Sequence, residues 1–267
     1  MGYADYHMHT EFSPDSREKI ENYCENALKR GIEEIVFTDH CEFPLMTRYP
    51  WPDFKARHEV ILRCRDKYGP MGLTIKEGAE IGQAYYDYRL LERLLRDVKF
   101  DFLIGSMHHA APKVDYNDIT ITESNFFKIL ERGFKYTENM IRTIDFDVVG
   151  HIDYIFKYCP PEMMDKYPPE MFADRYAELF KLIIARGKGI EVNCSGLRMA
   201  SVKKTLPSAE LLKIYKDLGG KIVTVGSDAH SLRSAHSGIE TGYANLKEAG
   251  FTQTARFTER KVSFVDI

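Results

Sequence analysis

The sequence lacks a long hydrophobic run. None of its apolar stretches reaches the roughly 18 residues that a helix needs to cross a bilayer, and Asp5 and His7 stand where a signal peptide would have its apolar segment. It also lacks an excess of positive charge, because the formal net charge is −3. Nucleic acid and anionic membranes attract basic proteins, so neither is expected as a partner. We therefore expect a cytoplasmic protein.

Cysteine is scarce and scattered. The five cysteines are odd in number and form no CxxC pair, which excludes a zinc knuckle and a thioredoxin-like redox motif. We interpret them as reduced thiols that pack in the interior. Hydrophobic residues make up 44% of the 267 positions, which is ample for a core. No linker or low-complexity segment divides the chain, so residues 1–267 are expected to form a single domain.

Short apolar runs alternate with longer amphipathic stretches along the chain. This alternation is typical of βα units around a parallel sheet. The predicted strands end at His7 and span 34–38, 74–78, 102–106, 147–150, 189–193 and 221–225. The predicted helices span 16–30, 53–68, 88–97, 123–143, 170–186, 208–218 and 239–249. Seven such units predict an α/β barrel close to the eight-stranded kind, with its active site at the carboxyl ends of the strands.

Turn and cap residues refine this pattern. Gly31 is predicted to end the first helix, and Ser208 is predicted to cap the start of the helix at 208–218. The loop at 43–52 is rich in proline and aromatic residues and is too irregular for a simple turn, so we regard it as a candidate lid.

Histidines and carboxylates gather at the predicted strand ends. His7 and His9 are two residues apart, so on a strand both imidazoles point to the same face, and Asp228 and His230 repeat this spacing. Asp15 lies in the loop after the first strand. The complete set of candidate metal ligands is His7, His9, Asp15, His40, Glu80, His109, His151, Asp228 and His230.

Bound cations explain this gathering better than strand capping does. One histidine at a strand end commonly bonds a carbonyl, but eight ligand-type residues at six strand ends would crowd one barrel mouth and repel or compete without a cation. Imidazole and carboxylate are the usual ligands of zinc, manganese and iron. Nine ligands suffice for three ions that share one carboxylate. His108 is expected to point away from the site if the fourth strand continues past it.

Taken in order, these motifs resemble the polymerase and histidinol phosphatase (PHP) superfamily. The motifs are HxH at 7–9, TDH at 38–40, a glutamate at 80, GSxHH at 105–109, GH at 150–151 and GSDAH at 226–230. The resemblance covers nearly the whole chain and implies a distorted (β/α)7 TIM-like barrel with three divalent ions, which are zinc, manganese or iron. It implies three ligand sets: His7, His9, Asp228 and Glu80; Glu80, His109 and His151; and Asp15, His40 and His230. Some members have histidine where this chain has Asp15.

Within the superfamily, the segment at 191–198 is similar to that of the monofunctional histidinol-phosphate phosphatases. The resemblance implies hydrolysis of the phosphomonoester L-histidinol phosphate to L-histidinol and phosphate, a step of histidine biosynthesis. A metal-bridging hydroxide would attack in line, with Asp228 accepting its hydrogen bond and Asp15 or His230 as candidate acids for the leaving group. Arg198 and, less strongly, Lys157 are candidate phosphate-binding residues because they follow strands at the same mouth.

Three other functions share parts of this pattern. A PHP-type nuclease or phosphoesterase acting on nucleic acid, or on another small phosphomonoester, would use the same metal site, but the chain has no basic stripe. A non-catalytic metal-binding module would be expected to have lost ligands, whereas all nine positions keep ligand-type residues. An amidohydrolase-like enzyme would use a similar barrel mouth to cleave a C–N bond. The sequence leaves the oligomeric state open.

Overall fold

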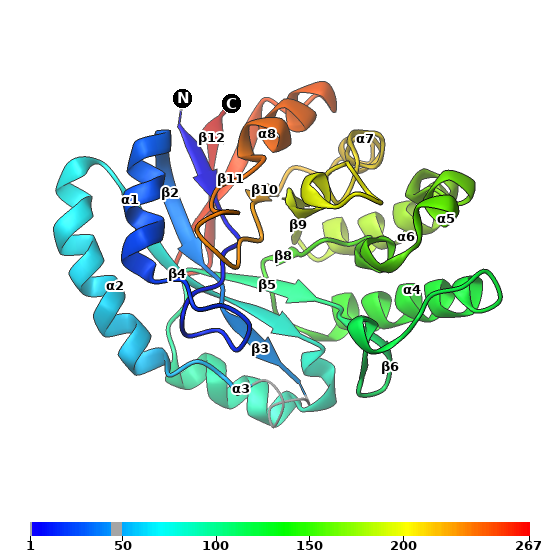
Figure 1. Ribbon diagram of the computed structural model, residues 1–267, viewed down its shortest axis with the longest axis horizontal. Helices are drawn as coiled ribbons and strands as arrows, with labels where there is room; N and C mark the ends of the chain where they lie inside the picture. Colours follow the sequence, from blue (N-terminus) through cyan, green and yellow to red (C-terminus); the bar gives the residue numbers. More distant parts are fainter. Residues whose placement is uncertain (1, 44–49) are drawn as a thin grey trace.

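The computed structural model describes residues 2–43 and 50–267, so most of the candidate lid at 43–52 lies outside the described residues. A parallel sheet forms the centre of the molecule, with strand order β1-β2-β4-β5-β8-β9-β10 (Figure 1). These strands are β1 (Tyr3–Asp5), β2 (Ile32–Phe37), β4 (Thr74–Gly82), β5 (Phe102–Ser106), β8 (Val148–Val149), β9 (Gly189–Asn193) and β10 (Val223–Gly226). The seven predicted strands are therefore confirmed.

The first and last strands of this sheet meet and close it into a barrel. The Tyr6 N–H donates to the Val225 carbonyl at 2.9 Å, and the Asp228 N–H donates to the His7 carbonyl at 2.8 Å. Just past the strands, Met8 and Ala229 form an isolated parallel bridge. Because this seam has only a few backbone bonds, the barrel is distorted, which agrees with the expected fold.

Helices cover the outside of the sheet (Figure 1). They are α1 (Ile20–Arg30), α2 (Phe54–Tyr68), α3 (Tyr88–Asp97), α4 (Phe126–Thr143), α5 (Pro161–Lys166), α6 (Ala173–Ala185), α7 (Ala209–Asp217) and α8 (Ile239–Glu248). Gly31 ends α1 with a left-handed φ of 68°, as predicted. Ser208 is the N-cap residue of α7, but its side chain does not make the capping bond. Among the described residues, no helix is both long and apolar enough to span a membrane.

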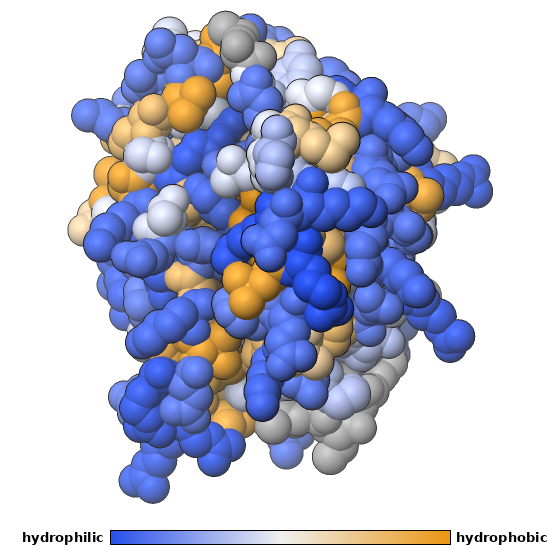
Figure 2. All heavy atoms as spheres, turned by 90° about the vertical axis from the view of Figure 1, so that its left-hand side faces the viewer, coloured by the Kyte–Doolittle hydropathy of each residue, from blue (hydrophilic) through white to orange (hydrophobic). Residues whose placement is uncertain are grey.

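The surface on the α1 and α2 side is mostly hydrophilic, with small separated hydrophobic spots (Figure 2). Residues on α2 account for this, because only four of its side chains, those of Arg57, Ile61, Cys64 and Tyr68, are buried. All five cysteines are free and buried, as expected for packing residues.

A C-terminal hairpin closes the amino-terminal end of the barrel, and the sequence pattern did not predict it. It consists of β11 (Gln253–Thr258) and β12 (Lys261–Asp266). Phe257 of β11 reaches into the barrel, where its ring lies 5.0 Å from that of Phe102, and Tyr6 packs on Phe102 at 4.9 Å. The Phe257 N–H donates to the Tyr6 hydroxyl at 2.9 Å. This end of the barrel interior is therefore filled with apolar and aromatic side chains, and the ligand-type residues gather at the opposite end.

Short elements shape the carboxyl end of the barrel. The strand β3 (His40–Glu42) pairs with the end of β4, which places His40 beside Glu80. A small hairpin of β6 (His109–Ala111) and β7 (Val114–Asp115) follows β5. The 3₁₀ turns are η1 (Gly69–Met71), η2 (Ala84–Tyr86), η3 (Tyr116–Asp118), η4 (Tyr154–Tyr158), η5 (Pro169–Phe172) and η6 (Ser195–Arg198). These elements carry much of the candidate site.

Candidate metal centre

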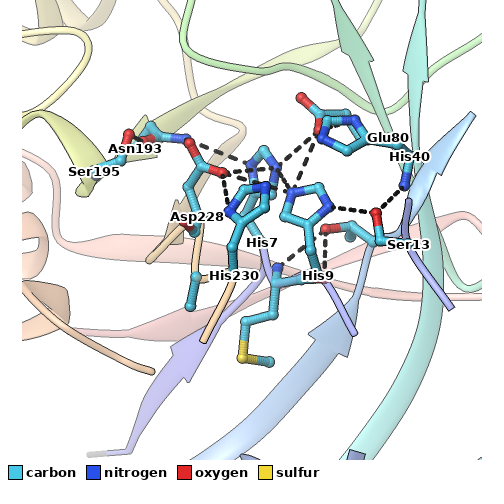
Figure 3. Close-up of polar contacts among 12 residues, drawn as sticks. His7, His9, Ser13, His40, Glu80, Asn193, Ser195, Asp228 and His230 are labelled. Atoms are coloured by element: carbon cyan, nitrogen blue, oxygen red, sulfur yellow. Dashed lines mark hydrogen bonds and ion pairs between the residues drawn. The ribbon is translucent and has the colours of Figure 1, made fainter. Parts of the chain in front are cut away.

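His7 and His9 lie side by side at the carboxyl end of β1, as their spacing predicted (Figure 3). Both are fully buried, and their Nε2 atoms are 3.1 Å apart. Met8, between them, points away into the hydrophobic core. The alternation of an extended chain thus delivers two imidazoles to one point inside the barrel.

Glu80 lies at the centre of the cluster, and its two oxygens face different histidines. Its Oε2 atom faces three ring nitrogens, His40 Nδ1 at 3.0 Å, His7 Nε2 at 3.2 Å and His9 Nε2 at 3.5 Å. Its Oε1 atom faces His151 Nε2 at 2.9 Å and His108 Nε2 at 3.2 Å. The Ser106 hydroxyl also donates to Oε1 at 2.6 Å. A carboxylate in this position can bridge two cations, one on each side.

Asp228 approaches the same point from β10. Its Oδ1 atom is 3.5 Å from His9 Nε2 and 3.7 Å from His7 Nε2. On the other side, Lys157 Nζ is 3.1 Å from Oδ2. Asp228 has a φ of 53°, a left-handed conformation that is costly for a residue other than glycine. The bond from its N–H to the His7 carbonyl holds this conformation.

A third group lies at the rim of the barrel. Asp15 Oδ2 is 3.2 Å from His40 Nε2 and 3.0 Å from His230 Nε2. The His9 ring is stacked between the rings of His40 and His230, at 4.2 and 4.1 Å. Asp15 and His230 are about one-third exposed, whereas His9 is buried, so this group connects the interior to solvent.

The ionisation of the cluster suits a cation. Burial raises the pKa of the Glu80 carboxyl, but the neighbouring His7 and His40 outweigh burial and hold the pKa well below its usual range. Burial similarly raises the pKa of Asp228, and Lys157 and His7 bring it below its usual range. Burial lowers the pKa of His9 to about 3. The two carboxylates are therefore anionic and His9 is neutral, which are the forms that bind metal ions. Burial lowers the pKa values of His7 and His40, but neighbouring carboxylates outweigh burial and raise both, so these two imidazoles carry positive charge that a bound cation would replace.

The donor atoms meet the distance requirement of metal binding. Four overlapping groups of ligand atoms lie within 4.8 Å of one another among the described residues: His7, His9 and Asp228; His7, Glu80 and His151; His40, Glu80 and His108; and His9, Asp15, His40 and His230. The same side chains therefore recur in several groups. Imidazole nitrogen and carboxylate oxygen are donors that bind divalent metal ions in proteins, so these side chains are candidate metal ligands.

Comparison with known proteins agrees with this geometry. The family model for the PHP domain matches residues 5–195, which is more than half of the chain. This chain belongs to the PHP family. The PHP assignment was the one that the motif order predicted, although Asp228 and His230 lie beyond the matched range.

Similar proteins of known sequence and structure cover nearly the whole PHP chain. A histidinol-phosphatase of Lactococcus lactis is 29% identical over 98% of this chain and 97% of its own length. A probable histidinol-phosphatase of Clostridium acetobutylicum is 29% identical over 85% of this chain and 86% of its own length. The crystal structure of histidinol phosphate phosphatase from Lactococcus lactis, complexed with zinc, L-histidinol and phosphate, has a TM-score of 0.81 at 23% identity and covers 98% of both chains. That structural likeness supports the PHP barrel fold.

One predicted ligand position needs correction. The structure brings His108, and not His109, into the PHP cluster, where His108 Nε2 lies 3.2 Å from Glu80. Neither ring nitrogen of His109 has a hydrogen-bond partner among the described residues, and His109 belongs to none of the four ligand groups. The prediction assumed that β5 continues to residue 109. Instead β5 ends at Ser106 and β6 begins at His109, so the bend between them reverses which side chain faces the site.

Two carboxylates outside the predicted ligand set hold histidines of the cluster in place. Glu191 Oε1 lies 2.6 Å from His7 Nδ1, and its Oε2 accepts the backbone N–H of His151 at 3.0 Å. Glu42 Oε1 lies 2.7 Å from His108 Nδ1. A carboxylate on one imidazole nitrogen fixes the ring and leaves the other nitrogen for a metal ion. The signal for Glu191 was an acidic residue within the apolar strand at 189–193.

The predicted phosphate-binding residues differ in position. A cavity of about 270 Å³ opens over the cluster, and Lys157 is part of its wall. Arg198 is not on that wall. Its Nη2 atom donates to the backbone carbonyls of Ser227 and Asp228 at 2.8 and 3.1 Å. The structure therefore brings Lys157 to the site and places Arg198 behind the turn that presents Asp228.

Proposed function

We propose that this chain is a metal-dependent phosphomonoesterase that hydrolyses L-histidinol phosphate to L-histidinol and phosphate. The observation that carries this proposal is the position of Glu80, whose two oxygens face separate sets of imidazoles at the base of an open cavity. The histidinol-phosphatases of similar length support the choice of substrate.

Three divalent ions fit the donor set. His7, His9 and Asp228 would hold one ion, with Glu80 as a shared ligand. His108 and His151 would hold the second on the other oxygen of Glu80. The third would lie between Asp15, His40 and His230. Divalent ions, when bound, supply a hydroxide at neutral pH and neutralise negative charge on phosphoryl oxygens.

The protein's own residues position the substrate around that chemistry. Lys157 projects into the cavity and would contact the phosphate as a point charge. Asp228 faces the centre of the cluster and would orient the attacking group by accepting a hydrogen bond. Burial raises the pKa of Asp15, but His40 and His230 bring it well below its usual range, so Asp15 is a carboxylate that would hold an ion and not a proton donor. The leaving alkoxide would instead take its proton from water at this exposed rim.

Metal removal and a substrate panel test the proposal. The protein is purified, its bound metals are measured by elemental analysis, and a chelator-treated sample is assayed for phosphate release. We expect loss of activity on chelation and recovery with zinc or manganese. The panel contains L-histidinol phosphate, other small phosphomonoesters, a single-stranded oligonucleotide and an amide substrate. Activity in a verified metal-free sample would refute the mechanism, and a preference for the oligonucleotide or the amide would refute the assigned reaction.

A further inference from the structure

Besides the candidate metal ligands and Glu42, four side chains form the wall of the cavity. They are Asp115, Asn117, Tyr154 and Lys157. The first two come from β7 and η3, and the other two come from η4. This wall therefore carries one carboxylate and one ammonium group, which come from different segments of the chain.

Aromatic packing and a backbone bond hold the two segments in fixed positions. The Tyr116 ring is stacked on that of Tyr158 at 5.7 Å, and the hydroxyls of Tyr154 and Tyr158 are 2.6 Å apart. The Tyr116 N–H donates to the His108 carbonyl at 3.0 Å. Asp115 directly precedes Tyr116 and is therefore held close to His108, a candidate metal ligand, by this backbone hydrogen bond. Its position relative to the cluster is set by the fold and does not depend on a free loop.

Lys157 and Asp115 differ in how their charges are compensated. Lys157 Nζ lies 3.1 Å from Asp228 and 4.8 Å from the centre of the Tyr154 ring, so its charge is satisfied at the metal end of the cavity. Asp115 is only 5% exposed, and its Oδ1 accepts the Asn117 N–H at 2.8 Å. Within residues 2–43 and 50–267, no basic side chain forms an ion pair with it. A buried carboxylate without a cation is costly, and a bound cation would remove that cost.

We propose that Asp115 binds the ammonium group of the substrate and thereby selects amino-alcohol phosphates over other phosphomonoesters. This inference rests on the proposed function, which places the phosphate at Lys157 and the metal cluster. L-Histidinol phosphate carries two basic groups, an amine and an imidazole. The imidazole has an ordinary pKa near 6.5 and is mostly neutral above pH 7.5, whereas the amine keeps its charge. The ammonium is therefore the partner that we assign to Asp115.

The test compares the wild type with Asp115→Asn on three phosphomonoesters at pH 8. The substrates are L-histidinol phosphate, its deamino analogue 3-(imidazol-4-yl)propyl phosphate, and L-phenylalaninol phosphate, which keeps the amine but lacks the imidazole. Asparagine keeps the Oδ1 acceptor for the Asn117 N–H, so the turn at η3 is preserved. Asp165→Asn, the same change at an exposed position on α5, is the matched control.

The expected readout is a change in substrate preference. The wild type should favour L-histidinol phosphate over the deamino analogue, and Asp115→Asn should reduce this ratio of kcat/KM values by about ten- to a hundredfold, the range for a hydrogen bond to a charged group. Asp115→Asn should lower kcat/KM for L-phenylalaninol phosphate by a factor similar to that for L-histidinol phosphate. Asp165→Asn should keep the wild-type ratio. Asn117→Asp, which adds a second carboxylate to the same wall, should raise the ratio.

Each contrary result has a distinct meaning. An unchanged ratio in a folded Asp115→Asn protein would overturn the ammonium site. A different result would be that Asp115→Asn lowers kcat/KM for the deamino analogue and leaves it unchanged for L-phenylalaninol phosphate. That result would assign Asp115 to the imidazole and overturn the proposal. A wild type without preference between the amine and deamino substrates would overturn the site while leaving the phosphatase function intact. A wild type that hydrolyses none of the three would overturn the proposed function and this site with it.

Discussion

Replacing His108 or His109 with leucine tests the metal centre most directly. The two residues are adjacent, and leucine has nearly the volume of histidine, so each change removes the ring nitrogens with little loss of packing. In the structure, His108 Nε2 lies 3.2 Å from Glu80 and its Nδ1 lies 2.7 Å from Glu42. His109 makes no hydrogen bond from its ring among the described residues. The pair therefore separates a candidate ligand from a residue that the structure places outside the ligand groups.

The expected magnitudes follow from these contacts. His108→Leu removes one candidate donor of the metal centre and the nearer of the two imidazole partners that Glu42 has among the described residues. Glu42 is 4% exposed and keeps only the imidazole of His40, at 3.2 Å. Removing one partner of a buried pair costs about 3–5 kcal/mol. If this whole cost falls on the metal-bound protein, metal affinity should drop by about 10²- to 10³-fold or more. His109→Leu breaks no described hydrogen bond, so the free energy of unfolding should change by less than about 1.5 kcal/mol.

The assay combines elemental analysis with phosphate release under subsaturating metal. His108→Leu should bind about one ion fewer than the wild type and lose at least about 99% of its activity, while His109→Leu should keep its metals and most of its activity. Circular dichroism checks that both variants fold. The assignment of His108 would be refuted if His109→Leu lost metal and His108→Leu retained it.

Further predictions concern the cavity wall, the barrel plug and one buried acid. Lys157→Met should raise KM for a phosphomonoester by about tenfold or more with a smaller change in kcat, because it removes a charged hydrogen bond to phosphate; an unchanged KM would exclude that contact. Arg198→Ala should instead lower kcat and bound metal, because its guanidinium supports the turn that presents Asp228; a pure KM effect would show that it reaches the phosphate. Phe257→Ala should reduce the free energy of unfolding by about 3–5 kcal/mol in denaturant titrations, since its ring fills the closed end of the barrel; a loss below about 1 kcal/mol would contradict this role. Burial raises the pKa of Asp153 to about 8, above the usual carboxyl value, so the folded protein binds this proton more tightly than the unfolded chain does. The contribution of Asp153 to the free energy of unfolding should therefore fall between about pH 4 and pH 8, by about 1.4 kcal/mol per pH unit. Asp153→Asn should therefore stabilise the protein more at pH 7 than at pH 5, by about 2.8 kcal/mol, and equal effects at both pH values would refute the shift.

Much of the fold could be predicted from local patterns. Seven apolar runs separated by amphipathic segments predicted the parallel barrel, because strand and helix periodicities are properties of neighbouring residues. The C-terminal hairpin escaped prediction. Phe257 is part of β11 because it packs on Phe102 and Tyr6, which are far away in the sequence, and no local signal reports such a contact.

The candidate site divides in the same way. His7, His9, Asp228 and His230 were found because a spacing of two residues near a strand end has only one geometric consequence. Glu191 was missed because its partner His7 is 184 residues away. The support it provides for the imidazole is visible only when β1 and β9 are seen in the same barrel.

By itself, the sequence determined which residue types reach the mouth of the barrel and hence that metal ions could be held there. Tertiary structure alone decided which of two adjacent histidines takes part, because the choice between His108 and His109 depends on where β5 ends and the chain bends. It also decided that Lys157 and Asp115 face the cavity while Arg198 lies behind it. The physical reason is that side chains alternate between the two faces of a sheet only within a regular strand. Beyond the end of the strand, the direction in which a side chain points depends on packing with distant segments.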